Sequence, residues 1–92
     1  MFEGILQLGY SIKIKNDDNS NYLFVCFSIE NCSYNNEFIL MGSNDKETYF
    51  DYKLFKPNED NEQVYRLRNV FKYYKLVNAG PVIKGKISIF SR

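Results

Sequence analysis

The chain of 92 residues contains no histidine and no tryptophan, and it has only two cysteines, two prolines and one alanine. Without histidine, it lacks the side chain that most often acts as a general acid or base near neutral pH and most often binds metals. Nothing is therefore available to activate the cysteines or to complete a zinc site with them. The sequence also has no nucleophile elbow and no glycine-rich phosphate loop. It predicts a protein that is not an enzyme and uses no metal or cofactor.

Long apolar segments are missing as well. The longest apolar run, residues 22–27, is far shorter than the roughly 20 residues that cross a bilayer. Glu3 stands where a signal peptide would carry a basic residue. We therefore expect a cytoplasmic protein without a membrane partner, in which a reducing environment keeps Cys26 and Cys32 unbridged.

Acidic residues are absent from the last third of the chain. Residues 1–62 hold all 11 carboxylates and five lysines, whereas residues 63–92 hold seven basic residues and no acid, so the net charge of +1 hides two opposed blocks. Opposed blocks can form two surfaces of opposite sign, each of which attracts a partner or a second copy of the chain. The polarity predicts binding, and self-association is one form that it can take.

The residues that are abundant indicate a folded domain. Apolar side chains make up 45% of the chain, with eight tyrosines and eight phenylalanines, which is more than a disordered segment carries. A chain of this length supports one core. We expect residues 1–92 to form a single domain.

Alternation of apolar and polar residues predicts five strands. Asx-rich segments at 16–21 and 31–36 predict turns that would join the first four strands in a meander. Lys84 and Lys86 on one face of the last strand are typical of a sheet edge. The five predicted strands cover residues 5–15, 22–30, 37–41, 48–55 and 82–90. The second of them is apolar on both faces up to Phe27, which predicts a central position in the sheet.

The segment 63–77 fits two structures. Six apolar residues are spaced by three and four, as on one face of a helix, and 78–81 (Asn-Ala-Gly-Pro) is a typical helix stop. A strand would use alternate aromatic residues, but it would place Asn69 on the buried face. We favour the helix. The six residues on its predicted face are Val64, Leu67, Val70, Phe71, Tyr74 and Val77.

The expected fold is therefore α+β, with a mainly antiparallel sheet of about five strands in the order ββββαβ and one helix packed on it. An all-β sandwich is the alternative if 63–77 is a strand.

On a helix, basic residues at i, i+4 and i+7 share a stripe, and a tyrosine beside it could stack on a base. If the last strand packs nearby, its two lysines and Arg92 would add to the same field. This pattern predicts a basic patch that binds phosphates. Its members are Arg68, Lys72, Lys75, Lys84, Lys86 and Tyr65.

The acidic half predicts a second surface. Its carboxylates fall in or beside the third and fourth predicted strands, where they could face a basic groove on another protein. The residues of this acidic surface are Glu37, Asp45, Glu47, Asp51, Glu59, Asp60 and Glu62.

Two functions follow. The first is a non-catalytic interaction protein that occupies a protein surface, as an inhibitor encoded by a phage or virus would; abundant asparagine and lysine fit an AT-rich genome. The second is nucleic-acid binding through the basic C-terminal third.

Overall fold

The described part of the chain is built of β-strands and contains no α-helix. The computed structural model describes residues 2–4, 11–16, 20–30, 37–56, 62–80 and 84–92. Within these ranges no helix is long and apolar enough to cross a membrane. The strands are β1 (Phe2–Gly4), β2 (Ser11–Lys15), β3 (Tyr22–Glu30), β4 (Phe38–Ser43), β5 (Phe50–Phe55), β6 (Glu62–Arg68), β7 (Tyr73–Asn78) and β8 (Lys84–Ser91).

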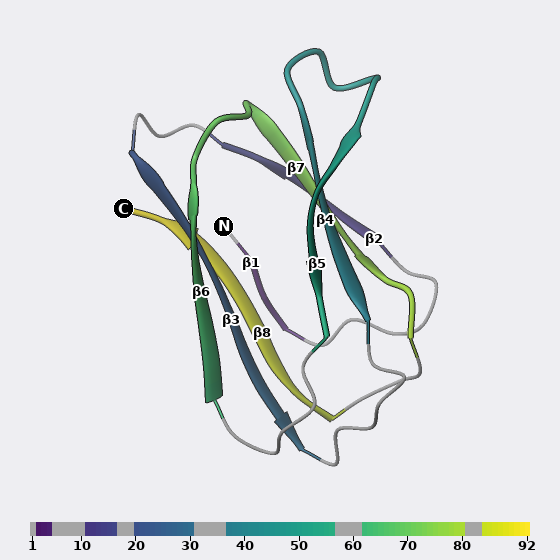
Figure 1. The fold of residues 1–92 in the computed structure, drawn as a ribbon, viewed down its shortest axis with the longest axis vertical. Coiled ribbons are helices and arrows are strands. Elements are labelled where there is room, and N and C mark those ends of the chain that lie inside the picture. Colours follow the sequence, from purple (N-terminus) through teal and green to yellow (C-terminus); the bar gives the residue numbers. More distant parts are fainter. Residues whose placement is uncertain (1, 5–10, 17–19, 31–36, 57–61, 81–83) are drawn as a thin grey trace.

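The strands form two four-stranded antiparallel sheets, which Figure 1 shows side by side. Sheet A has the order β1-β8-β3-β6, and sheet B has the order β2-β7-β4-β5. The first strand pairs with the last, the second with the seventh, the third with the sixth and the fourth with the fifth. A long hairpin rolled up in this way has the jelly-roll topology, in which two Greek keys close over one core.

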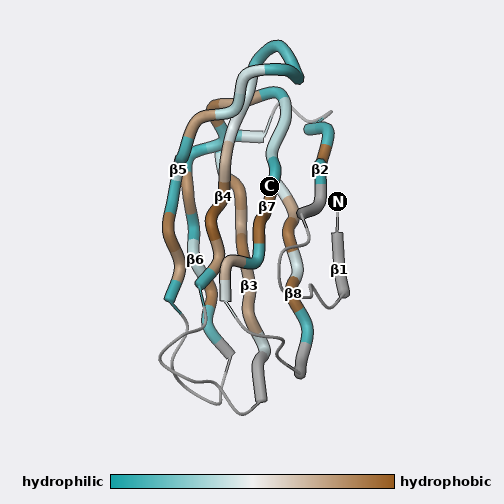
Figure 2. Tube along the Cα trace, turned by 90° about the vertical axis from the view of Figure 1, so that its right-hand side faces the viewer, coloured by the Kyte–Doolittle hydropathy of each residue, from teal (hydrophilic) through white to brown (hydrophobic). Residues whose placement is uncertain are grey.

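Buried apolar residues from both sheets face each other and form the core. Strand β7 is the clearest case, because Tyr74, Leu76 and Asn78 are buried while the residues between them are half-exposed. Figure 2 shows the same alternation of hydrophobic and hydrophilic residues along other strands. One apolar face per sheet is what a two-layer sandwich requires.

Aromatic rings fill the space between the sheets. The Phe27 ring of sheet A lies 5.0 Å from Phe38 and 5.3 Å from Phe55 of sheet B, measured between ring centroids. Tyr65 of sheet A lies 4.8 Å from Phe55. Such tilted pairs stabilise a core beyond the area that they bury.

The predicted α+β fold is wrong, because residues 63–77 form no helix. They contain two strands, β6 and β7, separated by the turn 69–72. Apolar and polar residues alternate along β6 and again along β7, with a four-residue turn between the two strands. Across this turn, the apolar residues of 63–77 happen to lie three and four positions apart, as they would on one face of a helix. The alternative all-β sandwich describes the structure.

The predicted meander is also wrong. Strands β2 and β3 follow each other in sequence but lie in different sheets, since β2 pairs with β7 and β3 pairs with β6 and β8. Of the predicted hairpins, only β4–β5 forms. Strand β3 is central in its sheet, as its apolar run predicted, but β8 is central too and is no sheet edge. Of the first predicted strand, residues 5–10 lie outside the described residues.

Candidate functional site

The outer face of sheet A brings the three arginines of the chain together with three aromatic rings. Cross-strand pairing sets them in two adjacent rows that run across β8, β3 and β6. In one row the member from β8 is Arg92, which directly follows the last residue of that strand. We call these six residues the arginine face. They are Arg92, Tyr22 and Arg68 in one row and Phe90, Phe24 and Arg66 in the next.

Backbone pairing fixes both rows. Tyr22 and Arg92 exchange two backbone hydrogen bonds, with N···O distances of 3.1 and 3.0 Å, which places their side chains directly opposite each other. Tyr22 is paired on its other side with Arg68. Two residues further along β3, Phe24 is paired with Phe90 on one side and with Arg66 on the other. Because side chains alternate along a strand, all six leave the sheet on the side away from the core.

Ring contacts hold the arginine face in order. The Phe24 and Phe90 rings are stacked, with centroids 5.3 Å apart and planes 11° apart. The Arg66 guanidinium carbon lies 4.8 Å from the centre of the Tyr22 ring, and that of Arg92 lies 5.1 Å from the centre of the Phe90 ring. All three arginines are exposed, and each cation–π contact of this kind contributes about 0.5–1 kcal/mol.

No carboxylate belongs to the arginine face. The row beyond it contains Ser88, Cys26 and Val64, of which Val64 is 62% exposed. Cys26, which we expected in a strand that is apolar on both faces, lies half-buried on this outer side; Cys32 lies outside the described residues. The three arginines make the face positive, and the row beyond it ends in an acidic residue, because Ser88 is paired on its other side with Glu3 of β1.

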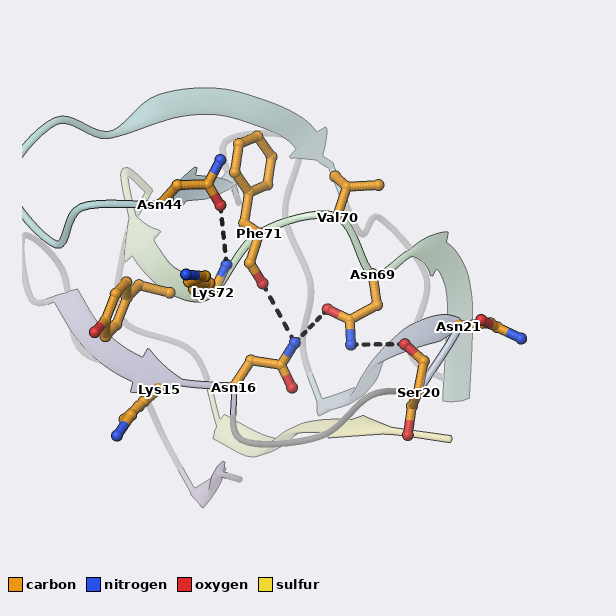
Figure 3. A pocket seen from close by; sticks show the side chains of 10 residues that line it. Lys15, Asn16, Ser20, Asn21, Asn44, Asn69, Val70, Phe71 and Lys72 are labelled. Atoms are coloured by element: carbon orange, nitrogen blue, oxygen red, sulfur yellow. Dashed lines mark hydrogen bonds between the residues drawn. The ribbon is translucent and has the colours of Figure 1, made fainter.

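A hollow of about 570 Å³ lies at the end of the sandwich where β2, β4, β6 and β7 begin or end. Figure 3 shows it from close by. We call it the end hollow. Its lining residues are Lys15, Asn16, Ser20, Asn21, Asn44, Asn69, Val70, Phe71, Lys72 and Tyr73.

The asparagines of the end hollow bind one another and the backbone. Asn16 Nδ2 donates to Asn69 Oδ1 at 2.6 Å, and Asn69 Nδ2 donates to the Ser20 carbonyl at 3.0 Å. Asn44 Oδ1 accepts from the Lys72 backbone N–H at 3.3 Å. These amides tie three loops together, so the side chains of the end hollow have a structural role.

Tyr74 joins the hydrogen-bond network of these asparagines from the core. Its buried hydroxyl donates to Asn69 Oδ1 at 2.8 Å and accepts from the N–H groups of Val70 and Phe71 at 3.0 and 3.2 Å. Burial raises the pKa of the Tyr74 hydroxyl, which keeps it a donor. The Phe71 ring packs on Gly42 so closely that a methyl group there would clash with it.

The structure divides the predicted basic patch between the two sheets. Arg68 lies on the outer face of sheet A, and Lys86 is exposed in β8 of the same sheet. Lys75 lies in sheet B, and Lys72 lies in the turn before it. Tyr65 is half-buried in the core beside Phe27 and Phe55, with its hydroxyl bonded to Gln63 at 3.0 Å. Lys84 pairs with Glu30 in the sheet A ladder. The predicted helical stripe does not exist.

The carboxylates of the predicted acidic surface are not gathered in the described residues. Glu37 forms a salt bridge with Lys56 at 3.5 Å. Asp45 turns back into its own loop, where its Oδ1 accepts from the N–H groups of Glu47 and Thr48 at 2.9 and 2.8 Å. Asp51 is exposed on β5, and Glu47 in the loop before it.

Glu59 and Asp60 lie outside the described residues, and Glu62 pairs with Ser28 in the sheet A ladder.

Four residues of the arginine face were missed by the sequence prediction. Tyr22, Phe24 and Phe90 were assigned to strands but not to a surface, and Arg66 was left out of the basic patch, whereas Arg92 was expected to add to its field. The signal was a period of two in residues 64–68, where Arg66 and Arg68 share a face. The helical interpretation separated them.

Comparison with models of protein families, with curated proteins and with solved structures finds no match for this chain.

Proposed function

We propose that this protein is a non-catalytic binding protein that holds single-stranded nucleic acid on the arginine face of sheet A. The observation that carries the proposal is the pair of adjacent rows that set three exposed arginines beside three aromatic rings. Proteins that bind single strands combine the same two elements, since cations follow the phosphates and rings stack on the bases.

Arginine suits this task better than lysine does. Its planar guanidinium forms two parallel hydrogen bonds to a phosphate and also stacks on rings. Arg66 and Arg92 already lie over the Tyr22 and Phe90 rings, so part of the entropy cost of fixing their side chains is met before a ligand arrives. A duplex keeps its bases stacked inside, and only a single strand can offer them to these rings.

The inhibitor role expected from the charge polarity stays a prediction. An acidic protein partner would need only the charges of the arginine face, whereas the ordered rings would gain nothing specific from carboxylates. The same experiment distinguishes the two ligands.

The test is a titration of a labelled oligothymidine at salt concentrations between about 50 and 200 mM. With three arginines on phosphates, the logarithm of the association constant should fall with the logarithm of the salt concentration with a slope of about −2, since each contact on a single strand contributes roughly −0.7. Replacing Arg68 with Gln should reduce that slope by about 0.7. Lys53→Gln, an exposed lysine on β5 of the other sheet, is the matched control and should leave the slope unchanged.

A second pair of variants tests the rings. Phe24→Ala should weaken binding about tenfold or more, because one base–aromatic stack contributes about 1–3 kcal/mol, and should leave the salt slope unchanged. Since the chain has no tryptophan, Tyr22→Trp introduces a single reporter whose emission should be quenched by the bound base. Equal binding of a base-free polyanion such as heparin, or no quenching at saturation, would overturn the proposal in favour of an acidic partner.

A further inference from the structure

The outer face of sheet B sets two lysines directly against each other. Lys13 of β2 and Lys75 of β7 are paired in the antiparallel ladder, and their neighbours in sequence Ile14, Tyr74 and Leu76 are buried, so both lysines face outward. Like charges at directly opposed positions destabilise a sheet. Such a pair needs a compensating interaction.

The protein itself supplies only part of that compensation. In the described ranges neither lysine forms a salt bridge. In their cross-strand row Met41 follows Lys75, and the first carboxylate is that of Asp51. Two strand spacings separate Asp51 from Lys75, which is roughly 10 Å. A carboxylate at that distance in water leaves the pair positive.

One aromatic ring connects the two lysines. The Tyr49 ring centre lies 4.7 Å from Lys75 Nζ and 6.0 Å from Lys13 Nζ. Contact with a ring face attracts both ammonium groups while leaving their N–H donors exposed. Tyr49 therefore holds the two cations beside each other without neutralising them.

A hollow of about 240 Å³ opens at this position and is lined by Lys13, Ile14, Lys15, Lys46, Tyr49 and Tyr73. Among the residues that the structure describes, no acidic one lines it. Its volume lies below the about 300–1,000 Å³ of pockets for drug-sized ligands, so it suits a small anion.

The loop that brings Lys46 and Tyr49 to this hollow is rigidly built. Ser43 Oγ donates to Asp45 Oδ1 at 2.9 Å and accepts from the Lys46 N–H at 3.0 Å. Lys46 has a φ of 70°, a left-handed conformation that costs energy without such support. The carboxylate of Asp45 is directed to the amides of Glu47 and Thr48. Glu47 is exposed and is the remaining acid of this loop.

We infer that the outer face of sheet B binds a small phosphate-bearing ligand, whose phosphate group lies in this hollow between Lys13 and Lys46, beside the Tyr49 ring that Lys75 contacts. Ammonium groups are suitable donors to a phosphate because they act as compact point charges. This site is separate from the arginine face, since it lies on the other sheet and takes a ligand without bases.

The experiment measures the thermal midpoint Tm with and without inorganic tripolyphosphate. Replacing Lys13 with Glu predicts two effects of opposite sign. Without ligand, Tm should rise by about 2–6 °C, because a repulsive pair becomes an ion pair. With tripolyphosphate, the increase in Tm that the unchanged protein shows by mass action should be lost. Lys53→Glu on β5, the opposite edge of the same sheet, makes the same change of charge and should keep that increase.

Amide chemical shifts distinguish the sources of the phosphate. Tripolyphosphate should move the amide signals of Lys13, Tyr49 and Lys75, and should do so equally in Arg68→Gln. Movement of these signals with oligothymidine alone would assign the lysines to a nucleic-acid backbone and overturn the small-ligand site. An unchanged Tm response in Lys13→Glu, or an equal loss in Lys53→Glu, would overturn it as well. Failure of oligothymidine to bind the arginine face would leave this result unaffected.

Discussion

Sheet A and sheet B are built alike, as four antiparallel strands with an apolar inner face, yet all three arginines lie on the outer face of sheet A, whereas the cations of sheet B are lysines. The arginine face combines planar cations with stacked rings. The outer face of sheet B holds Lys13 and Lys75 against a single ring, that of Tyr49. The first arrangement suits a ligand with both phosphates and bases, and the second suits phosphate alone.

The comparison also separates the inner faces from the outer faces. Residues that face inward bind the sheets to each other, whereas residues that face outward are available to ligands. Strand β3 carries both kinds in alternation, with Phe27 buried in the aromatic core and Phe24 half-buried on the arginine face. Substitutions along one strand can therefore test stability and binding separately.

Phe27→Ala should have the largest effect on stability. Its ring is 1% exposed and contacts rings of both sheets, so its removal should lower the free energy of unfolding by about 3–5 kcal/mol. Phe24→Ala on the same strand should cost only about 0.5–1.5 kcal/mol, mainly the stacked pair with Phe90. Urea denaturation measures both. Equal losses would show that the outer face contributes to the core.

Removing the Tyr74 hydroxyl should have the second largest effect on the free energy of unfolding. Tyr74→Phe removes the donor to Asn69 and the acceptor of two backbone N–H groups in the β6–β7 turn, and should lower the free energy of unfolding by about 1–3 kcal/mol. Its neighbour Tyr73 is half-exposed, and Tyr73→Phe should have little effect in the same denaturation experiment. A loss below roughly 0.5 kcal/mol in Tyr74→Phe would show that water replaces the hydroxyl.

The sequence predicted the strands better than their pairing. The range 22–30 was predicted as a central strand and is β3, and β4, β5 and β8 lie close to their predicted ranges, whereas β6 and β7 were predicted as a helix and β1 was not predicted. Alternation is a local signal, and it fixes which residues of a strand share a face. The partner of each strand is decided by packing over long sequence distances, so a jelly roll and a meander can share one pattern.

Asn69 explains why the helix was preferred in error. The strand interpretation seemed to bury an unpaired amide, which is costly. In the structure the Asn69 side chain makes three hydrogen bonds, to Asn16, Ser20 and Tyr74. Asn16 and Ser20 come from about fifty residues earlier in the chain, and no local pattern reveals that they are near. The same distance hid the arginine face, which needs β8, β3 and β6 side by side.

A change of pH should affect the lysine site of sheet B before the arginine face. Hydrogen bonds from the amides of Thr48 and Glu47 and from Ser43 lower the pKa of Asp45 to about 2, from an ordinary value of about 3.9. A lowered carboxyl pKa stabilises the folded loop fully above the ordinary value, and this contribution is lost as pH falls toward about 2.

NMR titration of the Glu47 and Thr48 amides checks the expected change. Their signals should move with a midpoint near pH 2, while the amides of Tyr22 and Phe24 stay constant over that range unless the whole domain unfolds. In Asp45→Asn the midpoint should be absent. A midpoint near pH 4 would show that the loop does not hold the carboxylate.

Exchanging arginine for lysine on sheet A, and lysine for arginine on sheet B, should have the smallest effect. These variants test most directly whether the two outer faces bind different ligands. Arg66→Lys keeps the charge but removes the planar group that lies 4.8 Å from the Tyr22 ring centre. Oligothymidine affinity should fall about two- to fivefold, the equivalent of about 0.5–1 kcal/mol of cation–π energy, with the salt slope unchanged. Lys75→Arg on sheet B should leave that affinity as it was, because the proposed oligonucleotide site lies on the outer face of the other sheet. An equal change in both variants would mean that charge alone governs binding, and that the difference between the two faces has no functional role.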